Sequence, residues 1–211
     1  MVPLVAPGLD GYILGLLPSR DPVIAEMEAY AAEHDVPIVG PAVATLLEVL
    51  ARSIGADRVF EMGSAIGYST AFFASAVGRG GQVTYTDGSP ENAEKARRYL
   101  ERMDLLERVT IRVSDAVAAL EATTGYFDVI FIDVDKEGYP QALQAAAPRV
   151  RRGGYLIADN VLWSGRVVDP NARDAATEGI RQFNARLFGL PEYRSVIVPL
   201  RDGVAIARRE K

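Results

Sequence analysis

The residues best suited to bind a ligand form the segment EMGSAIGYS at positions 61–69. It follows a strand-like apolar run over 58–61 and precedes a helical pattern over 69–77, so it is expected to be a strand-to-helix turn with unpaired backbone N–H groups. Gly63 and Gly67 would let the backbone pass close to a ligand that a Cβ atom would obstruct. Because the middle glycine of G-x-G-x-x-G is missing, a pyrophosphate is the weaker candidate ligand.

Two acidic residues narrow the choice of ligand. A carboxylate at Glu61, directly before the turn, would repel a diphosphate but attract the ammonium of a methionine moiety. Asp87 ends the next strand-like run, where a carboxylate can accept hydrogen bonds from both hydroxyls of a ribose. These features predict S-adenosylmethionine; the alternative is a tight turn with a helix cap. Asp115 with Ala116, after the third run, could frame an adenine ring, although Asp115 is equally explained as a helix cap.

A second cluster of oxygen ligands follows two later strand-like runs. Asp133 comes after the run over 127–132, and Asp159 and Asn160 come after the run over 154–158. Because the carboxyl ends of neighbouring parallel strands meet at one edge of a sheet, these two carboxylates and one amide are expected to converge. Such a donor set suits Mg²⁺ or another divalent cation, such as Mn²⁺ or Ca²⁺. The alternative is that all three are ordinary turn residues.

Lys136 is the candidate general base. It lies three residues after Asp133, so its amine could approach whatever the metal holds and accept a proton there. The alternative is a solvated surface lysine. Few other groups are available, because the chain has no cysteine and one histidine, His34, in a polar stretch. Thiolate chemistry and Cys-ligated metals are therefore excluded, and a Ser/His/Asp triad is disfavoured.

Composition predicts one soluble domain spanning 1–211. The chain has 211 residues, of which 49% are hydrophobic and 24% are charged, within the range of a single core. A net charge of −5 gives no electrostatic reason to bind nucleic acid. Without a membrane-length apolar run or a basic leader, a cytoplasmic protein with a small-molecule partner is expected.

The elements that must position these residues alternate between strand and helix. Strands are predicted at 58–61, 82–86, 109–113, 127–132 and 154–158, and helices at 69–77, 90–103, 115–122 and 138–150. Two strand-like runs, 193–199 and 203–207, are joined so closely that they must form an antiparallel hairpin. Two further helices, 22–34 and 41–54, precede the first strand. We therefore expect an α/β fold with a seven-stranded, mostly parallel sheet that ends in an antiparallel hairpin and carries helices on both faces. The N-terminal helices are expected within 1–54 and the core within 57–208.

Three motifs together resemble the cation-dependent O-methyltransferases, a family that includes catechol and caffeoyl-CoA O-methyltransferases. They are FEMGSAIGYS at 60–69, FIDVDK at 131–136 and ADNVLWSG at 158–165, and the resemblance spans approximately 39–207. It implies a class I methyltransferase, Rossmann-like fold. It also implies metal-assisted transfer of a methyl group from S-adenosylmethionine to a hydroxyl of a catechol-like vicinal dihydroxy aromatic, by a homodimer whose N-terminal helices contribute to the interface.

The resemblance also assigns roles to residues at matching positions. The cofactor contacts that it implies are Val39, Glu61, Gly63, Ser64, Tyr68, Ser69, Asp87, Asp115, Ala116, Asp133 and Asp135. It implies metal ligands at Asp133, Asp159 and Asn160, catalysis by Lys136 with Asp133, and a substrate pocket formed by Trp163, Lys136 and Asn160. Trp163, Tyr68 and Tyr139 are candidates to stack on the acceptor ring.

Two other functions remain compatible with the motifs. In a metal-independent N- or O-methyltransferase, Asp159 and Asn160 would contact a small-molecule substrate directly. In a nucleotide- or NAD-binding protein, the turn at Gly63 would hold a phosphate. A non-catalytic partner subunit would have no need of two acids, an amide and a lysine together.

Overall fold

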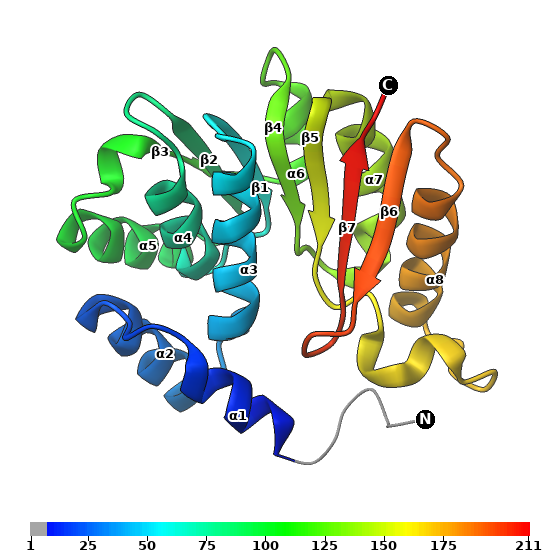
Figure 1. The fold of residues 1–211 in the computed structure, drawn as a ribbon, viewed down its shortest axis with the longest axis horizontal. Helices are drawn as coiled ribbons and strands as arrows, with labels where there is room; N and C mark the ends of the chain where they lie inside the picture. Colours follow the sequence, from blue (N-terminus) through cyan, green and yellow to red (C-terminus); the bar gives the residue numbers. More distant parts are fainter. Residues whose placement is uncertain (1–7) are drawn as a thin grey trace.

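The computed structural model describes residues 8–211, within which seven strands form one sheet in the order β3-β2-β1-β4-β5-β7-β6 (Figure 1). The strands are β1 (Arg58–Met62), β2 (Gln82–Asp87), β3 (Val109–Val113), β4 (Phe127–Ile132), β5 (Val150–Ala158), β6 (Tyr193–Val198) and β7 (Val204–Arg209). Strands β1 to β5 are parallel, and β7 runs antiparallel to both β5 and β6. The predicted sheet with a C-terminal hairpin is confirmed.

Helices cover both faces of this sheet, as predicted. The α-helices of the described part are α1 (Leu9–Leu16), α2 (Pro22–Glu33), α3 (Gly40–Ser53), α4 (Tyr68–Ala76), α5 (Pro90–Arg102), α6 (Ala116–Glu121), α7 (Tyr139–Ala146) and α8 (Ala175–Phe188). Short 3₁₀ turns are η1 (Leu106–Arg108), η2 (Lys136–Gly138), η3 (Ala147–Arg149) and η4 (Trp163–Val168). Helices α3, α4 and α5 pack on one face, and α6, α7 and α8 pack on the other. Between residues 8 and 211, no helix has both the length and the apolar composition needed to cross a bilayer.

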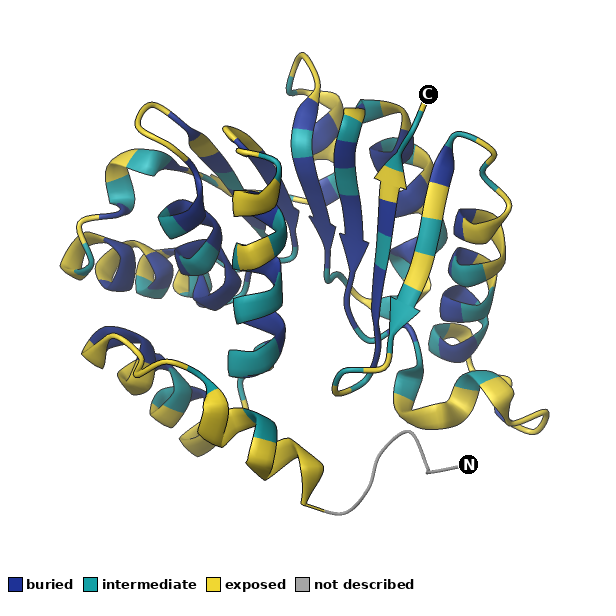
Figure 2. Ribbon diagram, viewed as in Figure 1, coloured by how far each residue is buried: buried dark blue, intermediate teal, exposed yellow. Residues whose placement is uncertain are grey.

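The central strand β4 shows why the sheet needs both helical layers. Val129 and Phe131 point into the core beneath α3 and α4, whereas Ile130 and Ile132 point into the core beneath α6 and α7. All four side chains are buried, as expected for a parallel strand covered on both faces. Figure 2 shows this buried centre in contrast to the alternating exposure along β6.

The structure differs from the sequence prediction at the boundary between α7 and β5 and in two additional helices. The helix expected over 138–150 ends at Ala146, and the 3₁₀ turn that follows contains Pro148, which cannot donate the next helical hydrogen bond. Strand β5 therefore begins at Val150 instead of 154, and it pairs with β4 from there. Helices α1 and α8 were not predicted.

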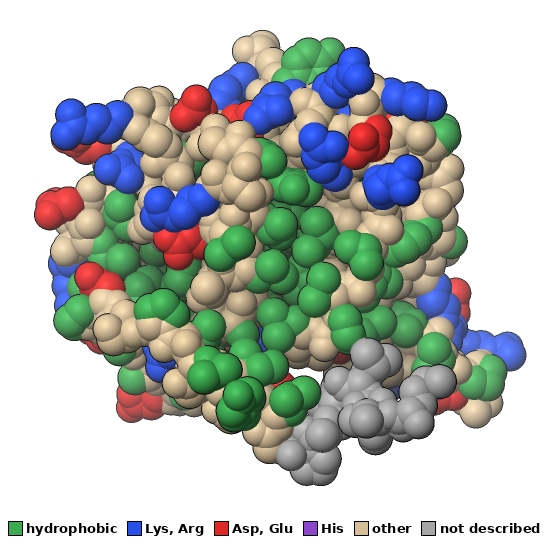
Figure 3. All heavy atoms as spheres, in the orientation of Figure 1, with side chains coloured by type: hydrophobic (Ala, Val, Ile, Leu, Met, Phe, Trp, Pro, Cys, Tyr) green, Lys and Arg blue, Asp and Glu red, His purple; other side chains and the backbone are tan. Residues whose placement is uncertain are grey.

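The β5-β7-β6 part of the sheet is apolar on the side that carries α3. Figure 3 shows hydrophobic side chains gathered over this region, with Lys and Arg side chains along the upper rim. Val49 on α3 is 56% exposed, and Val196 on β6 is 53% exposed. Ile206, the cross-strand partner of Val196, packs against the core on this side. The apolar surface therefore continues past the helices that cover the rest of the face.

Candidate functional site

A cavity of about 1480 Å³ opens at the carboxyl ends of the parallel strands. This is where strand order reverses between β1 and β4, the usual ligand crevice of an open α/β sheet. The predicted site residues that line it are Val39, Gly63, Ser64, Tyr68, Ser69, Asp87, Asp115, Ala116, Asp133, Asp135, Lys136, Asp159, Asn160 and Trp163. Of the predicted site residues, Glu61 and the stacking candidate Tyr139 do not reach its wall.

Glu61 lies beneath the turn and is fully buried. Its carboxylate accepts hydrogen bonds from Ser69 and Thr70, in the first turn of α4. Burial raises the pKa of Glu61 to about 7, against the lowering effect of these hydroxyls. Glu61 therefore ties the end of β1 to α4, and Thr70, which no sequence motif singled out, shares that task.

The two glycines of the turn make room for protein atoms, a reason for glycine that the sequence did not suggest. A Cβ atom on Gly63 would lie 2.3 Å from the carbonyl oxygen of Asp133, and one on Gly67 would lie 2.8 Å from Ala96 Cβ. Both glycines have positive φ, 85° and 83°, which also favours glycine. Gly63 thus lets the ends of β1 and β4 approach each other, and Gly67 lets α5 pack against the turn.

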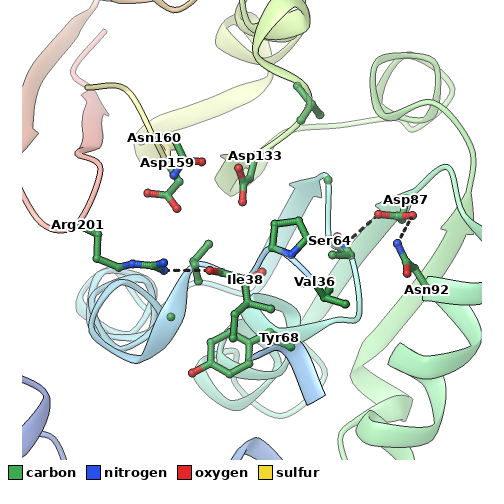
Figure 4. Close-up of a pocket in the computed structure, with 18 of the residues that line it drawn as sticks. Val36, Ile38, Ser64, Tyr68, Asp87, Asn92, Asp133, Asp159, Asn160 and Arg201 are labelled. Carbon is green, nitrogen blue, oxygen red and sulfur yellow. Dashed lines mark hydrogen bonds between the residues drawn. The ribbon is translucent and has the colours of Figure 1, made fainter. Parts of the chain in front are cut away.

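Asp87 holds the turn in place from the end of β2. Its Oδ2 accepts a hydrogen bond from Ala65 N at 3.0 Å, and its Oδ1 accepts from Ser89 N at 2.8 Å and Asn92 Nδ2 at 3.2 Å (Figure 4). Oδ2 keeps a free lone pair, and the residue lines the cavity. At the next strand end, Asp115 caps α6 by accepting from Ala118 N at 2.8 Å, so the capping explanation of Asp115 is confirmed although the residue also lines the cavity.

The three oxygen-bearing side chains of the predicted cluster come together, because successive strand ends are hydrogen bonded to one another. Asp133 N donates to Met62 O at 2.8 Å, and Asp159 N donates to Ile132 O at 3.2 Å. Asn160 then turns the chain with φ of 56°, a left-handed conformation that asparagine tolerates. Figure 4 shows Asp133, Asp159 and Asn160 at one side of the cavity.

Asp159 is a buried carboxylate that a cation could stabilise. Its side chain is buried, and Oδ1 has no hydrogen-bond partner. Burial, with a further contribution from the charge of Asp133, raises the pKa of Asp159 to about 7. No three His, Cys, Asp or Glu side chains are grouped as metal ligands between residues 8 and 211, so an ion here would need the Asn160 amide beside the two carboxylates. The donor set fits a hard divalent cation.

Lys136 is not a solvated surface lysine. Its side chain is 12% exposed, and Nζ donates to Asp133 Oδ1 at 2.8 Å and to Val134 O at 3.2 Å. The ammonium therefore lies beside the oxygen cluster, on the cavity wall. The arrangement places a proton-transfer group next to a candidate cation site.

Similarity along the whole chain decides the class of this site. The family described as O-methyltransferase matches residues 19–210. The chain is 33% identical over 210 residues to a catechol O-methyltransferase from Niastella koreensis, with 94% of this chain and 95% of that protein covered. The chain belongs to the O-methyltransferase family.

Solved structures agree with this assignment. An O-methyltransferase from Bacillus cereus in complex with SAH superposes with a TM-score of 0.88 at 29% identity, covering 96% of this chain and 97% of that one. The O-methyltransferase TomG from Streptomyces achromogenes, in complex with SAM, gives a TM-score of 0.89 at 27% identity, covering 97% and 96%. The predicted family, fold class and enzyme class, an S-adenosylmethionine-dependent O-methyltransferase, are confirmed. Membership argues against the NAD-binding alternative.

Tyr139 has a different place in this O-methyltransferase from the one expected. The side chain is fully buried and its ring packs edge-on against Phe183 with centroids 5.2 Å apart, so the prediction that it stacks on an acceptor is wrong. Its hydroxyl accepts from Lys136 Nζ at 3.0 Å and donates to Asp159 O at 2.9 Å. Tyr139 therefore positions the lysine relative to the oxygen cluster.

Tyr68 joins the cavity to the N-terminal helices of the O-methyltransferase. Its hydroxyl donates to Glu28 Oε1 at 2.7 Å, and Glu28 pairs with Arg20 at 2.9 Å. Burial and the Glu28 carboxylate raise the pKa of Tyr68 well above its ordinary value, so the hydroxyl remains a donor. No local sequence signal connects these three residues, which come from α4, α2 and the segment before α2.

Proposed function

We propose that this enzyme methylates one hydroxyl of a catechol-like vicinal dihydroxy aromatic, using S-adenosylmethionine and a divalent cation, Mg²⁺ or a related ion such as Mn²⁺ or Ca²⁺. The observation that carries the proposal is the buried, unpartnered Oδ1 of Asp159 beside Asp133, with Lys136 on the same wall. A methyltransferase without a metal would have little reason to bury the Asp159 carboxylate beside Asp133 with one oxygen unpartnered, since burying unpaired charge is costly.

The methyl donor is proposed to lie along the carboxyl ends of β1, β2 and β3. The free lone pair of Asp87 would accept from a ribose hydroxyl, and Asp115 with Ala116 would border the adenine. The remaining cofactor contacts that we propose are Val39, Gly63, Ser64, Tyr68, Ser69, Asp133 and Asp135, which all line the cavity. Glu61, below the wall, would support the donor through Ser69.

Asp133, Asp159 and Asn160 are proposed to hold the cation. A divalent ion bound there supplies Lewis-acid stabilisation of the acceptor oxyanion. The three residues would also select acceptors with two adjacent oxygens, because their cluster leaves one side open to the cavity. Trp163 and Asn160 would border the acceptor ring, with Trp163 partly exposed on the cavity wall.

Lys136 is proposed to move the proton. In the methyl-transfer step the sulfonium S–CH₃ bond breaks as the O–CH₃ bond forms, which leaves S-adenosylhomocysteine and a methyl ether. The hydroxyl proton would go to Lys136 Nζ, after the ammonium that pairs with Asp133 has released a proton of its own to solvent. Tyr139 and the Val134 carbonyl hold Nζ at the cavity wall for this transfer. Positioning of this kind can lower a barrier by ~7–11 kcal/mol in favourable cases.

Removal of the cation tests the proposal. The enzyme stripped with EDTA and then assayed with catechol and S-adenosylmethionine should lose most of its activity, and added Mg²⁺ should restore it. The product should be the O-methyl ether by mass spectrometry. Equal rates with and without cation would contradict the metal proposal and favour a metal-independent N- or O-methyltransferase.

We also propose that the enzyme is a homodimer to which the N-terminal helix α3 contributes. The apolar surface that carries Val49 and Val196 supports this, because contiguous exposed apolar patches commonly mark interfaces and a second copy presents the same surface for a two-fold contact. Light scattering should give twice the chain mass, and Val196→Asp should shift the protein towards monomer. The control Val168→Asp, at a residue 83% exposed in η4, should remain dimeric. A monomer in the unaltered protein would contradict the proposal.

A further inference from the structure

The basic side chains that line the cavity differ in their partners. Acidic residues predominate on the wall, and the basic residues are Arg20, Lys136 and Arg201. Arg20 pairs with Glu28 at 2.9 Å, and Lys136 pairs with Asp133 at 2.8 Å. Arg201 forms no ion pair within residues 8–211, although its charge opposes the rise in the pKa of Asp159. A cation without a partner on a ligand cavity is free to bind an anion brought by that ligand.

Arg201 reaches into the cavity from the turn between β6 and β7. Its backbone has φ of 50°, and its Nη1 donates to Ile38 O at 2.9 Å (Figure 4). A Cβ atom on Gly40 would lie 2.6 Å from Nη1, so the guanidinium occupies space that only glycine leaves open. This contact sets the direction of the side chain in the absence of any carboxylate partner.

Arg201 lies on the cavity wall near the oxygen cluster and has N–H donors to spare. In Figure 4 its side chain lies on the same side of the cavity as Asp159 and Asn160, with Tyr68 beyond Ile38. Within residues 8–211, one of the five N–H donors of its guanidinium is occupied, by Ile38 O. The remaining donors form the planar fork that matches a carboxylate, a geometry that a lysine cannot reproduce.

We propose that Arg201 selects acceptors that carry a carboxylate, so that the preferred substrates are aromatic diols with an acidic substituent. This inference rests on the proposed function, since it assumes that the diol binds at Asp133, Asp159 and Asn160. The diol end would then face the oxygen cluster, and a carboxylate at another ring position would face the guanidinium. Arg201 is a specificity residue in this arrangement and takes no part in the methyl transfer.

A matched pair of acceptors tests the assignment. 3,4-Dihydroxybenzoate and 4-methylcatechol share the diol and differ in charge, and kcat/KM is measured for both with unaltered enzyme, Arg201→Gln and Arg201→Lys. The quantity compared is the ratio of kcat/KM for the benzoate to kcat/KM for the methylcatechol, because intrinsic reactivity differences cancel between variants. Arg201→Gln should lower this ratio about tenfold or more, mainly through KM, as expected for loss of one charge-assisted pair. Arg201→Lys should restore part of it.

The control is Arg152→Gln, an exposed arginine on β5 that does not line the cavity, and it should leave the ratio unchanged. Melting temperatures verify that each variant is folded. Equal losses on both acceptors in Arg201→Gln would show that the residue only braces Ile38, and would overturn the inference. Failure of the unaltered enzyme to methylate either diol is a separate outcome, which would overturn the proposed function and this inference with it.

Discussion

The hydroxyl of Tyr139 accepts a hydrogen bond from Lys136 Nζ at 3.0 Å while it donates one to the backbone carbonyl of Asp159 at 2.9 Å. A single buried hydroxyl thus connects the proposed base to the proposed metal loop. The ring has no freedom to move, because it is fully buried against Phe183. The distance between the lysine and the oxygen cluster is therefore set by a side chain that no acceptor touches.

Tyr139→Phe should lower kcat severalfold with little change in KM for S-adenosylmethionine, since Lys136 loses one of its three acceptors. Stability should fall by about 1–3 kcal/mol, because the Asp159 carbonyl loses its partner. Tyr193→Phe is a matched control, as its buried hydroxyl donates to Ala147 O at 2.6 Å far from the cavity. It should cost similar stability and leave kcat unchanged; similar kcat losses in both variants would contradict a positioning role for Tyr139.

The buried carboxyl of Glu61 predicts how stability depends on pH. Its folded-state pKa of about 7 lies above the ordinary value of 4.5, so folding favours the protonated form. The resulting stability is fully present below about pH 4.5 and is lost as the pH rises through 7, by an amount on the order of 3 kcal/mol. The measurement is the free energy of unfolding by urea from pH 5 to 8 with EDTA present. Glu61→Gln should make its decline with pH less steep. Part of the decline should remain, because the raised pKa of Asp159 contributes in the same direction.

The control for this measurement is Glu121→Gln, at an exposed residue that ends α6. Its unfolding free energy should follow the same pH dependence as the unaltered protein. If Glu61→Gln also followed that dependence, the carboxyl of Glu61 would have to be ionised at no cost in the folded state.

Asp159→Asn should separate the cost of buried charge from the benefit of the cation. In EDTA at pH 8 the variant should be at least as stable as the unaltered enzyme, because it removes a buried carboxylate that lacks a partner. Added Mg²⁺ should raise the melting temperature of the unaltered enzyme but not of the variant. Asp135→Asn, which alters no proposed metal ligand, should keep the response to Mg²⁺; an equal Mg²⁺ response in Asp159→Asn would place the ion elsewhere.

Gly63→Ala should disrupt the junction between β1 and β4. The new Cβ atom would meet Asp133 O at 2.3 Å, in addition to the strain of a φ of 85°. Gly80→Ala is the matched control, since Gly80 has φ of 86° but nothing within 4 Å of its Cβ position. Gly80→Ala should cost about 1–2 kcal/mol in unfolding free energy from the backbone alone. Gly63→Ala should lower the free energy of unfolding by more than this and should also lower activity. Equal losses of stability for the two variants in thermal denaturation would refute the close approach of Gly63 to Asp133 O.

Much of the sheet and of the site could be predicted from the sequence, because strands are recognised from contiguous residues. The apolar run FDVIFI predicts β4, and the rule that ligands bind at carboxyl ends then brings Asp133, Asp159 and Asn160 together. Helix α8 was not predicted, although Ile180, Phe183 and Leu187 follow helical spacing, since polar residues surround them. That helix also supports the site: a Cβ atom on Gly179 would lie 2.3 Å from Lys136 O, so α8 packs directly on η2.

The sequence by itself determined the family, the order of the strands and of most helices along the chain, and the residue types at the edge of the sheet, because motifs and periodicity are properties of neighbouring residues. Only the tertiary structure decided which partner each side chain takes. In the folded protein, Glu61 accepts from the first turn of α4, and Tyr139 contacts Lys136 and no acceptor. Arg201 donates to Ile38, 163 residues away in the chain. Such contacts depend on how several packed elements place their surfaces at once, and no local pattern records that.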